Sequence, residues 1–271
     1  MTAEAKREPA PLANGNSGQY AIRLRGLTKR FGRQLIFQDL NLDVRRGEIL
    51  GIAGGSGTGK SVLLRTVLGL LPFEAGSIEV FGNDLKSLNN EERIGIERRW
   101  GVLFQDGALF SSLTVLQNVQ VPMREHLSLP PKTMDELARL KIAMAGLPAD
   151  AAFKFPSELS GGMRKRAGLA RALALDPDIV FLDEPTSGLD PIGAAAFDRL
   201  IHNLQQTLGL TVYMITHDLD SIFAICDRVA VLADRHIVRE GAPQELVRNP
   251  GHPWVQDYFC GERGRLIQKA L

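Results

Sequence analysis

The stretch that decides the fold reads Glu48-Ile49-Leu50-Gly51-Ile52-Ala53, followed directly by Gly54-Gly55-Ser56-Gly57-Thr58-Gly59-Lys60-Ser61. The first part is a short apolar run of the kind that forms a buried strand. The second part fits the phosphate-loop pattern G-x-x-x-x-G-K-[ST], and residues Ser61 to Leu71 carry apolar side chains at helical spacing. A strand, a glycine-rich loop and a helix in this order predict a nucleotide-binding α/β core.

The glycine-rich loop is expected to bind phosphate through its backbone. Bare N–H groups at a helix N-terminus can surround phosphate oxygens, and the loop offers Gly54, Gly55, Ser56, Gly57, Thr58 and Gly59. We expect Lys60 to reach the β- and γ-phosphates and the Ser61 hydroxyl to bind Mg²⁺. The alternative is a glycine-rich turn with a lysine that faces solvent, which the flanking strand and helix disfavour.

Two later apolar runs, Asp178–Leu182 and Thr211–Ile215, predict buried strands that end in polar residues. Asp183 follows the first run and is placed to hold Mg²⁺ directly or through water. Glu184 is placed to orient the attacking water, and His217 follows the second run near it. An acidic pair after a strand is, by itself, more often a solvated strand end, and a lone histidine is more often structural.

A second candidate anion site is the phrase Leu159-Ser160-Gly161-Gly162-Met163. Ser160 is a natural helix N-cap, and Gly161 and Gly162 leave their N–H groups exposed. Taken alone, the phrase also fits an ordinary capped helix.

The rest of the chain predicts one nucleotide-binding domain with flanking segments. Residues 1–19 are rich in Ala, Pro, Asn, Gly and charge, and we interpret them as a disordered tail. Residues 20–249 are expected to form the ATP-binding domain, with a mostly helical insert at about 106–171 that includes a helix at 134–145. Alternating strands are expected at 20–24 and 40–44, a closing hairpin at 228–232 and 236–240, and a C-terminal extension at 250–271.

Composition narrows the function. The chain has 271 residues, and its 44% hydrophobic and 23% charged residues are ordinary for a globular protein. Its net charge of +1 gives no global preference for nucleic acid. No apolar run approaches the roughly 18–20 residues of a membrane span, and the N-terminus lacks the apolar region of a secretory signal. We therefore expect a cytosolic protein in which Cys226 and Cys260 are reduced, although the sequence does not exclude a disulfide.

The order of these motifs resembles that of the ATP-binding cassette (ABC) family. Further positions that match the family's motifs are Phe31, for stacking on adenine; Gln105, in a loop that senses Mg²⁺; and Asp190, at the end of Pro185-Thr186-Ser187-Gly188-Leu189-Asp190. The resemblance implies a P-loop NTPase (RecA-like) α/β core, an antiparallel β subdomain and an inserted helical subdomain. Phe31 as a core residue and Gln105 as a plain loop residue are the alternatives.

By the same resemblance, two copies would close face to face on two ATP molecules. Each nucleotide site would combine Lys60 of one subunit with Ser160, Gly161 and Gly162 of the other, and Asp190 would help couple the two sites. ATP hydrolysis would then drive a separate transmembrane permease. Met163 departs from the family's usual Gln, and a thioether cannot donate a hydrogen bond.

A narrower resemblance is to the ATPases of Mla/Mce-type lipid transporters of the Gram-negative envelope. It rests on Phe104-Gln105-Asp106-Gly107-Ala108-Leu109-Phe110, on Val121-Pro122-Met123-Arg124-Glu125-His126 and on Met163. It implies phospholipid cargo, a permease, an Mce-domain substrate-binding protein, room for a small regulatory subunit, and a place on the cytoplasmic face of the inner membrane. The apolar segment would form a cleft for the permease; the alternative is that it is subdomain core.

Two rival functions remain open at this point. A cassette for another cargo, such as polar amino acids, would share every nucleotide motif. A non-transport ABC protein would be expected to carry two cassettes, long inserted arms or a basic surface, and none of these is evident in the sequence.

Overall fold

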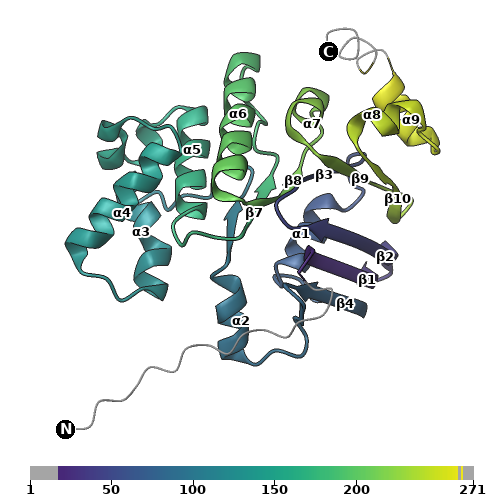
Figure 1. The fold of residues 1–271 in the computed structure, drawn as a ribbon, viewed down its shortest axis with the longest axis horizontal. Coiled ribbons are helices and arrows are strands. Elements are labelled where there is room, and N and C mark those ends of the chain that lie inside the picture. Colours follow the sequence, from purple (N-terminus) through teal and green to yellow (C-terminus); the bar gives the residue numbers. More distant parts are fainter. Residues whose placement is uncertain (1–17, 262–263, 265–271) are drawn as a thin grey trace.

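A computed structural model describes residues 18–261 and Gly264 of the chain (Figure 1). The expected strand–loop–helix stretch is present as β3 (Ile49–Ala53), the glycine-rich loop and α1 (Lys60–Val67). The helix is shorter than the expected 61–71 because Gly69 takes a left-handed conformation with φ 70° and turns the chain away. Almost all of the expected N-terminal tail lies outside the described residues.

A six-stranded sheet forms the centre of the molecule, in the order β10-β9-β3-β8-β7-β6. Its other members are β6 (Trp100–Leu103), β7 (Ile179–Asp183), β8 (Thr211–Ile215), β9 (Arg228–Ala233) and β10 (His236–Gly241). All neighbours pair in parallel except the hairpin β9–β10. The carboxyl ends of the parallel strands therefore meet at one edge, which is where ligands bind in such sheets.

Alternate residues of the central strands enter two separate cores. In β7, Val180 and Leu182 face one core, whereas Ile179 and Phe181 face the other. The second core is closed by α1 and by a four-stranded antiparallel sheet in the order β2-β1-β4-β5. Its strands are β1 (Tyr20–Phe31), β2 (Gln34–Arg45), β4 (Ala75–Val80) and β5 (Asn83–Asp84). This sheet is the expected antiparallel β subdomain, and its first two strands are longer than expected.

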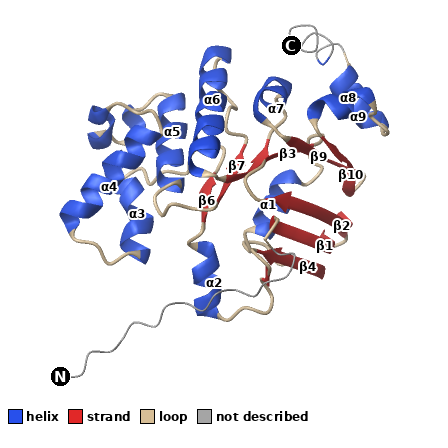
Figure 2. Cartoon of the chain, viewed as in Figure 1, coloured by secondary structure: helices blue, strands red, loops and turns tan. Residues whose placement is uncertain are grey.

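The helical subdomain lies at the opposite end of the molecule from the antiparallel sheet (Figures 1 and 2). It contains α3 (Val115–His126), α4 (Pro131–Met144), two short 3₁₀ turns (Ala149–Phe153 and Pro156–Glu158) and α5 (Gly161–Ala172). The sequence reasoning missed α2 (Asn90–Glu97), which precedes β6 and begins with a capping box between Asn89 and Glu92.

The remaining helices, α6 (Pro191–Leu208), α7 (Leu219–Ile225), α8 (Pro243–Arg248) and α9 (Pro253–Cys260), contribute to the first core. Within α9, Val255 and Phe259 are fully buried in that core. Cys226 and Cys260 are both free thiols. Across the described part of the chain, no helix combines the length and apolarity needed to cross a membrane.

Candidate nucleotide site

The glycine-rich loop is folded tightly at the carboxyl end of β3. Gly59 has φ 101°, and a Cβ there would lie 2.6 Å from Cγ2 of Ile36, so a side chain is excluded for two reasons. The Lys60 ammonium donates hydrogen bonds to the carbonyl oxygens of Gly54 (2.8 Å) and Gly55 (2.9 Å). Burial lowers the pKa of Lys60, and the negative charges of Glu184 and Asp183 act in the opposite direction. The lysine thus lies inside the curve of the loop.

The two side chains expected to hold Mg²⁺ meet across the strand ends. The Ser61 hydroxyl donates a hydrogen bond to Oδ1 of Asp183 over 3.4 Å. Burial, and then the charge of Glu184, raise the pKa of Asp183. In the described residues, no three His, Cys, Asp or Glu side chains gather as metal ligands. A hydroxyl and one carboxylate suit Mg²⁺, which keeps several waters and takes substrate phosphates as its other ligands.

Glu184 and His217 form a pair at the same edge of the sheet. Nδ1 of His217 lies 3.0 Å from Oε1 of Glu184. The Glu184 side chain is 22% exposed and that of His217 is 63% exposed. Both residues line a small open cavity of about 200 Å³. Glu184 has φ 49°, a left-handed conformation that is uncommon for a residue with a side chain. Such strain is a frequent feature of functional sites.

Ser160 caps α5 as expected: its hydroxyl accepts a hydrogen bond from the N–H of Met163 over 3.3 Å. Asp190 plays the same part for α6 by accepting from the N–H of Gly193 over 2.9 Å. Ser160 and Gly161 are exposed, whereas Met163 packs against the first core. The helix α5 packs on α3, α4 and β6, on the other face of the sheet from α1. Ser160 therefore begins a helix on one face of the central sheet, whereas the phosphate loop leads into α1 on the other face.

Gln105 and Phe31, the other two predicted site residues, come from two other parts of the fold. Gln105 is exposed in the turn that follows β6, which is closed by a bond from the Gly107 N–H to the Phe104 carbonyl (2.8 Å). Phe31 ends β1 and is 45% exposed, and Nζ of the buried Lys29 lies 4.8 Å from its ring centre. One part of the phenyl ring is thus available for stacking on a planar base.

Sequence reasoning overlooked several charged residues beside these motifs. Arg30 of β1 and Arg33 of the β1–β2 turn share a cavity of about 570 Å³ with Gly57 and Thr58 of the loop. Lys165 of α5 reaches the backbone of Glu184. A basic turn next to an aromatic is visible in the sequence, but the Lys165 contact joins residues on different elements and leaves no local signal.

Known proteins with similar sequences place the chain in one family. The family model described as ABC transporter matches residues 37–187, which include Lys60, Gln105, Ser160 and the Asp183–Glu184 pair. The probable ribonucleotide transport ATP-binding protein mkl of Mycobacterium leprae is 42% identical over 90% of this chain and 70% of its own length. The intermembrane phospholipid transport system ATP-binding protein MlaF of Haemophilus influenzae is 40% identical over 90% of this chain and 92% of its own length. MlaF of Escherichia coli K12 is 38% identical over 89% of this chain and 88% of its own length.

Solved structures agree with these relatives. The dimeric ABC transporter cassette MJ0796, also solved in a post-hydrolysis state bound to ADP and Pi, is 30% identical with a TM-score of 0.75, over 82% of this chain and 98% of that one. The protein cbiO1 of Clostridium perfringens is part of the ABC transporter complex cbiONQ. It is 27% identical with a TM-score of 0.78, and the match covers 92% of this chain and 99% of cbiO1. The family model, these relatives and the nucleotide-site geometry lead to one conclusion: the chain belongs to the ABC transporter family and is one of its ATPases.

Proposed function

We propose that the chain energises the transport of phospholipid or a related lipid through a separate permease at the cytoplasmic face of the inner membrane. Two copies would enclose two ATP molecules, each with Mg²⁺. The main support for a lipid cargo is the similarity to MlaF proteins, which are 38–40% identical over about nine tenths of the chain. By extension, an Mce-domain substrate-binding protein and a small regulatory subunit are proposed partners.

The dimer is supported by the separation of the two anion sites. The phosphate loop and α1 belong to one face of the central sheet, and Ser160 begins a helix on the other. Ser160 and Gly161 are exposed, so the N-terminus of this helix is accessible to a phosphate held by a second copy. We propose that Ser160, Gly161 and Gly162 bind the γ-phosphate held by the partner's Lys60, with Asp190 at the contact between the sites.

The chemistry follows from the pairs at the strand ends. Phe31 would stack on adenine, the 54–59 backbone would surround the phosphates, and Lys60 would turn from the loop carbonyls to the β- and γ-phosphates. Ser61, Asp183 and Gln105 would hold Mg²⁺, which neutralises charge on the phosphates when bound. Glu184 would then orient the attacking water, and His217, at 3.0 Å from it, would contact the γ-phosphate.

A shallow cavity supports the proposed contact with a permease. It measures about 280 Å³ and lies between β6, α3 and α5. Phe110, Val121 and Pro122 supply its apolar wall, and Glu125 and Arg171 supply its polar rim. Phe110 is 51% exposed, and its ring centre lies 6.0 Å from Cζ of Arg171, so the apolar wall and the charged rim are adjacent. An apolar centre with a charged rim suits a short helix of a partner protein.

A second cargo is supported by a specific observation. The mkl proteins, which are named for ribonucleotide transport, are 40–42% identical to this chain. A phosphate-bearing small molecule and a phospholipid differ in where they reside, and both would be handled by the partners and not by this chain. The cargo therefore has to be decided with the assembled transporter.

The deciding experiment is purification of the tagged full-length chain from membranes with its bound subunits, followed by identification of the subunits and of the lipids. We expect a permease and an Mce-domain protein, bound phospholipid, and ATP hydrolysis that responds to phospholipid but not to ribonucleotides. A response to ribonucleotides alone would instead support the second cargo. Phe110→Asp should abolish copurification of the permease, whereas Ile94→Asp, at an exposed residue of α2 outside the cavity, should not.

A further inference from the structure

Lys165 connects the helical subdomain to Glu184, at the carboxyl end of β7. It lies on α5, the helix that Ser160 caps, and is only 7% exposed. Its ammonium donates a hydrogen bond to the backbone carbonyl of Glu184 over 2.9 Å. Burial lowers the pKa of Lys165, whereas the charges of Asp106, just after Gln105, and of Glu184 act to raise it. One buried cation therefore lies among three motifs of the nucleotide site.

The residue that receives this bond is under strain. Glu184 has φ 49°, and a left-handed conformation of a residue with a side chain persists only when its surroundings hold it. Its N–H donates to the Ile215 carbonyl over 2.9 Å, and its carboxylate contacts His217. Its carbonyl accepts from the Ser187 N–H over 3.2 Å, within the same turn, and from Lys165. Among these contacts, the bond from Lys165 comes from the helical subdomain.

The same helix is also tied to the cavity proposed for the permease. Arg171 donates to the carbonyls of Ala108 (2.7 Å) and Gly107 (2.9 Å) and lines that cavity with Phe110. A partner that shifted this wall would act on α5, the helix that carries Lys165. Helices transmit such shifts because they move as rigid bodies.

We propose that Lys165 is a positioning residue for ATP hydrolysis, which holds the main chain of Glu184 so that its carboxylate stays aligned with His217 and the attacking water. The inference rests on the proposed role of Glu184 as the residue that orients this water. In this arrangement, loss of the ammonium affects the chemical step and not the binding of nucleotide, because Lys165 contacts neither the phosphate loop nor Phe31 through any bond seen in the described residues.

The test compares purified full-length variants for ATP kcat, KM and nucleotide affinity. Lys165→Met keeps the length of the side chain and removes the donor; Lys165→Arg keeps a donor. Arg166→Met is the matched control, because the neighbouring Arg166 bonds to the Ala145 carbonyl inside the helical subdomain. We expect Lys165→Met to lower kcat about tenfold or more with KM and affinity within about twofold, Lys165→Arg to recover most of kcat, and Arg166→Met to stay within about twofold of the wild type.

Further variants separate this inference from the function on which it rests. If Glu184→Gln hydrolyses ATP normally, the role of Glu184 itself is wrong. If Glu184→Gln loses turnover while Lys165→Met does not, only the inference about Lys165 fails. An equal loss in Lys165→Met and Arg166→Met, or no recovery in Lys165→Arg, would reduce Lys165 to a packing residue. Lys165→Met added to Glu184→Gln should cause no further loss, because Lys165 acts through Glu184.

Discussion

At the scale of single residues, burial shifts the pKa values of charged groups at the carboxyl ends of the central strands, and neighbouring charges change these values further. Asp183 has a raised pKa and Lys60 a lowered one, both chiefly through burial. The places of these residues, Asp183 at the end of a strand and Lys60 at the start of a helix, were predictable from the sequence because a buried strand and a glycine-rich loop are local signals. The Glu184–His217 distance and the Lys165 bond were not, since they depend on how β7, β8 and α5 meet.

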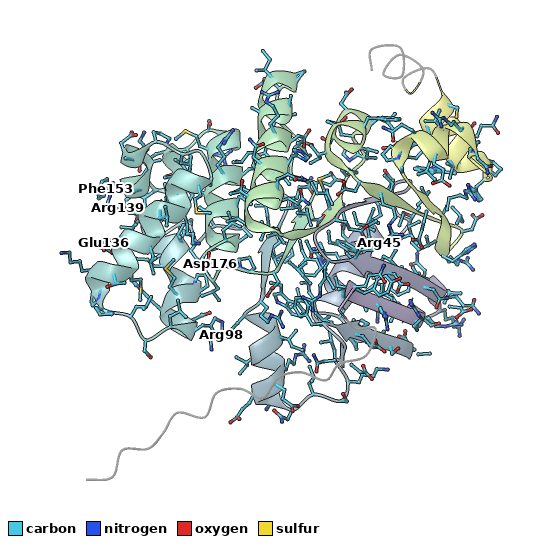
Figure 3. All side chains as sticks on the ribbon, in the orientation of Figure 1. Arg45, Arg98, Glu136, Arg139, Phe153 and Asp176 are labelled. Carbon is cyan, nitrogen blue, oxygen red and sulfur yellow. The ribbon has the colours of Figure 1, made fainter. Side chains whose placement is uncertain are left out.

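Glu184→Gln removes the proposed acceptor for the water proton and keeps the shape of the side chain. We expect nucleotide affinity to be retained and turnover to fall by about 10²- to 10⁴-fold, the usual contribution of a general base. Measured ATPase rates and nucleotide binding check both parts. Glu136→Gln is the control, since Glu136 is exposed on α4 in the helical subdomain (Figure 3) and should leave both unchanged. Unimpaired hydrolysis by Glu184→Gln would contradict the assigned role.

Asp198 gives the protein a pH-dependent stability. Burial, reinforced by the charges of Asp218 and Asp220, raises its pKa to about 6 from an ordinary 3.8, against the opposing effects of Ser221 and Arg199. The folded state therefore keeps the proton at pH values where the unfolded chain has released it. This contribution to stability is present below about pH 4 and is lost as the pH rises through about 6.

Asp198→Asn should remove this dependence. Relative to the wild type, the free energy of unfolding of the variant should rise between about pH 4 and 6 and then level off. Ser221→Ala should move the same window to higher pH, because the Ser221 hydroxyl donates to Oδ2 of Asp198 over 2.8 Å and stabilises its charged form. Denaturation curves across the pH range measure both effects. A difference between Asp198→Asn and the wild type that is constant with pH would show that Asp198 titrates normally.

At the scale of elements, the strands were easier to predict than the helices around them. The range 211–215 was predicted with the bounds that the structure has, because buried parallel strands form uninterrupted apolar runs. The antiparallel hairpin at β9–β10 is also confirmed. The sequence of α2 is largely polar, and its burial is limited to Ile96, so no apolar stripe marked it. Its capping box at Asn89 was the signal available.

The contact between α5 and β6 is close enough to require glycine. A Cβ at Gly101 of β6 would lie 2.1 Å from the carbonyl oxygen of Ala172, a backbone atom that cannot move aside. We expect Gly101→Ala to lower the free energy of unfolding by about 1–3 kcal/mol, as overpacking does. Gly95→Ala, in the exposed middle of α2 with nothing within 4 Å of the added carbon, should be neutral or stabilise by up to about 1 kcal/mol. Equal effects of the two in chemical denaturation would contradict the close contact.

At the scale of the whole molecule, the C-terminal part belongs with the nucleotide site more closely than the expected boundary at 249 suggests. Val255 and Phe259 of α9 lie in the main core, and a Cβ at Gly55 would lie 3.4 Å from Nε1 of Trp254. His252 contacts Asp234, which lines the cavity beside the loop. We therefore propose that the ATP-binding domain extends through α9. Contacts of this kind join distant parts of the sequence and carry no periodic signal.

The two-copy site makes a prediction that no single-chain site can meet. Lys60→Ala and Ser160→Arg should each inactivate a dimer of identical subunits, because every site then lacks one half. In a mixed dimer, both defects fall in one site, and the other site combines the intact Ser160 of one subunit with the intact Lys60 of its partner. Random mixing makes half of the dimers mixed, so activity should recover to about a quarter of the wild-type level if the sites act independently. Steady-state ATPase assays of the mixture, after exchange of subunits, measure this recovery.

Mixing Lys60→Ala with Glu184→Gln is the control, because both residues serve the nucleotide bound by their own subunit. Neither site of this mixed dimer is intact, so no recovery is expected. If Lys60→Ala and Ser160→Arg stay inactive together while wild-type subunits exchange normally, each chain must complete its site alone.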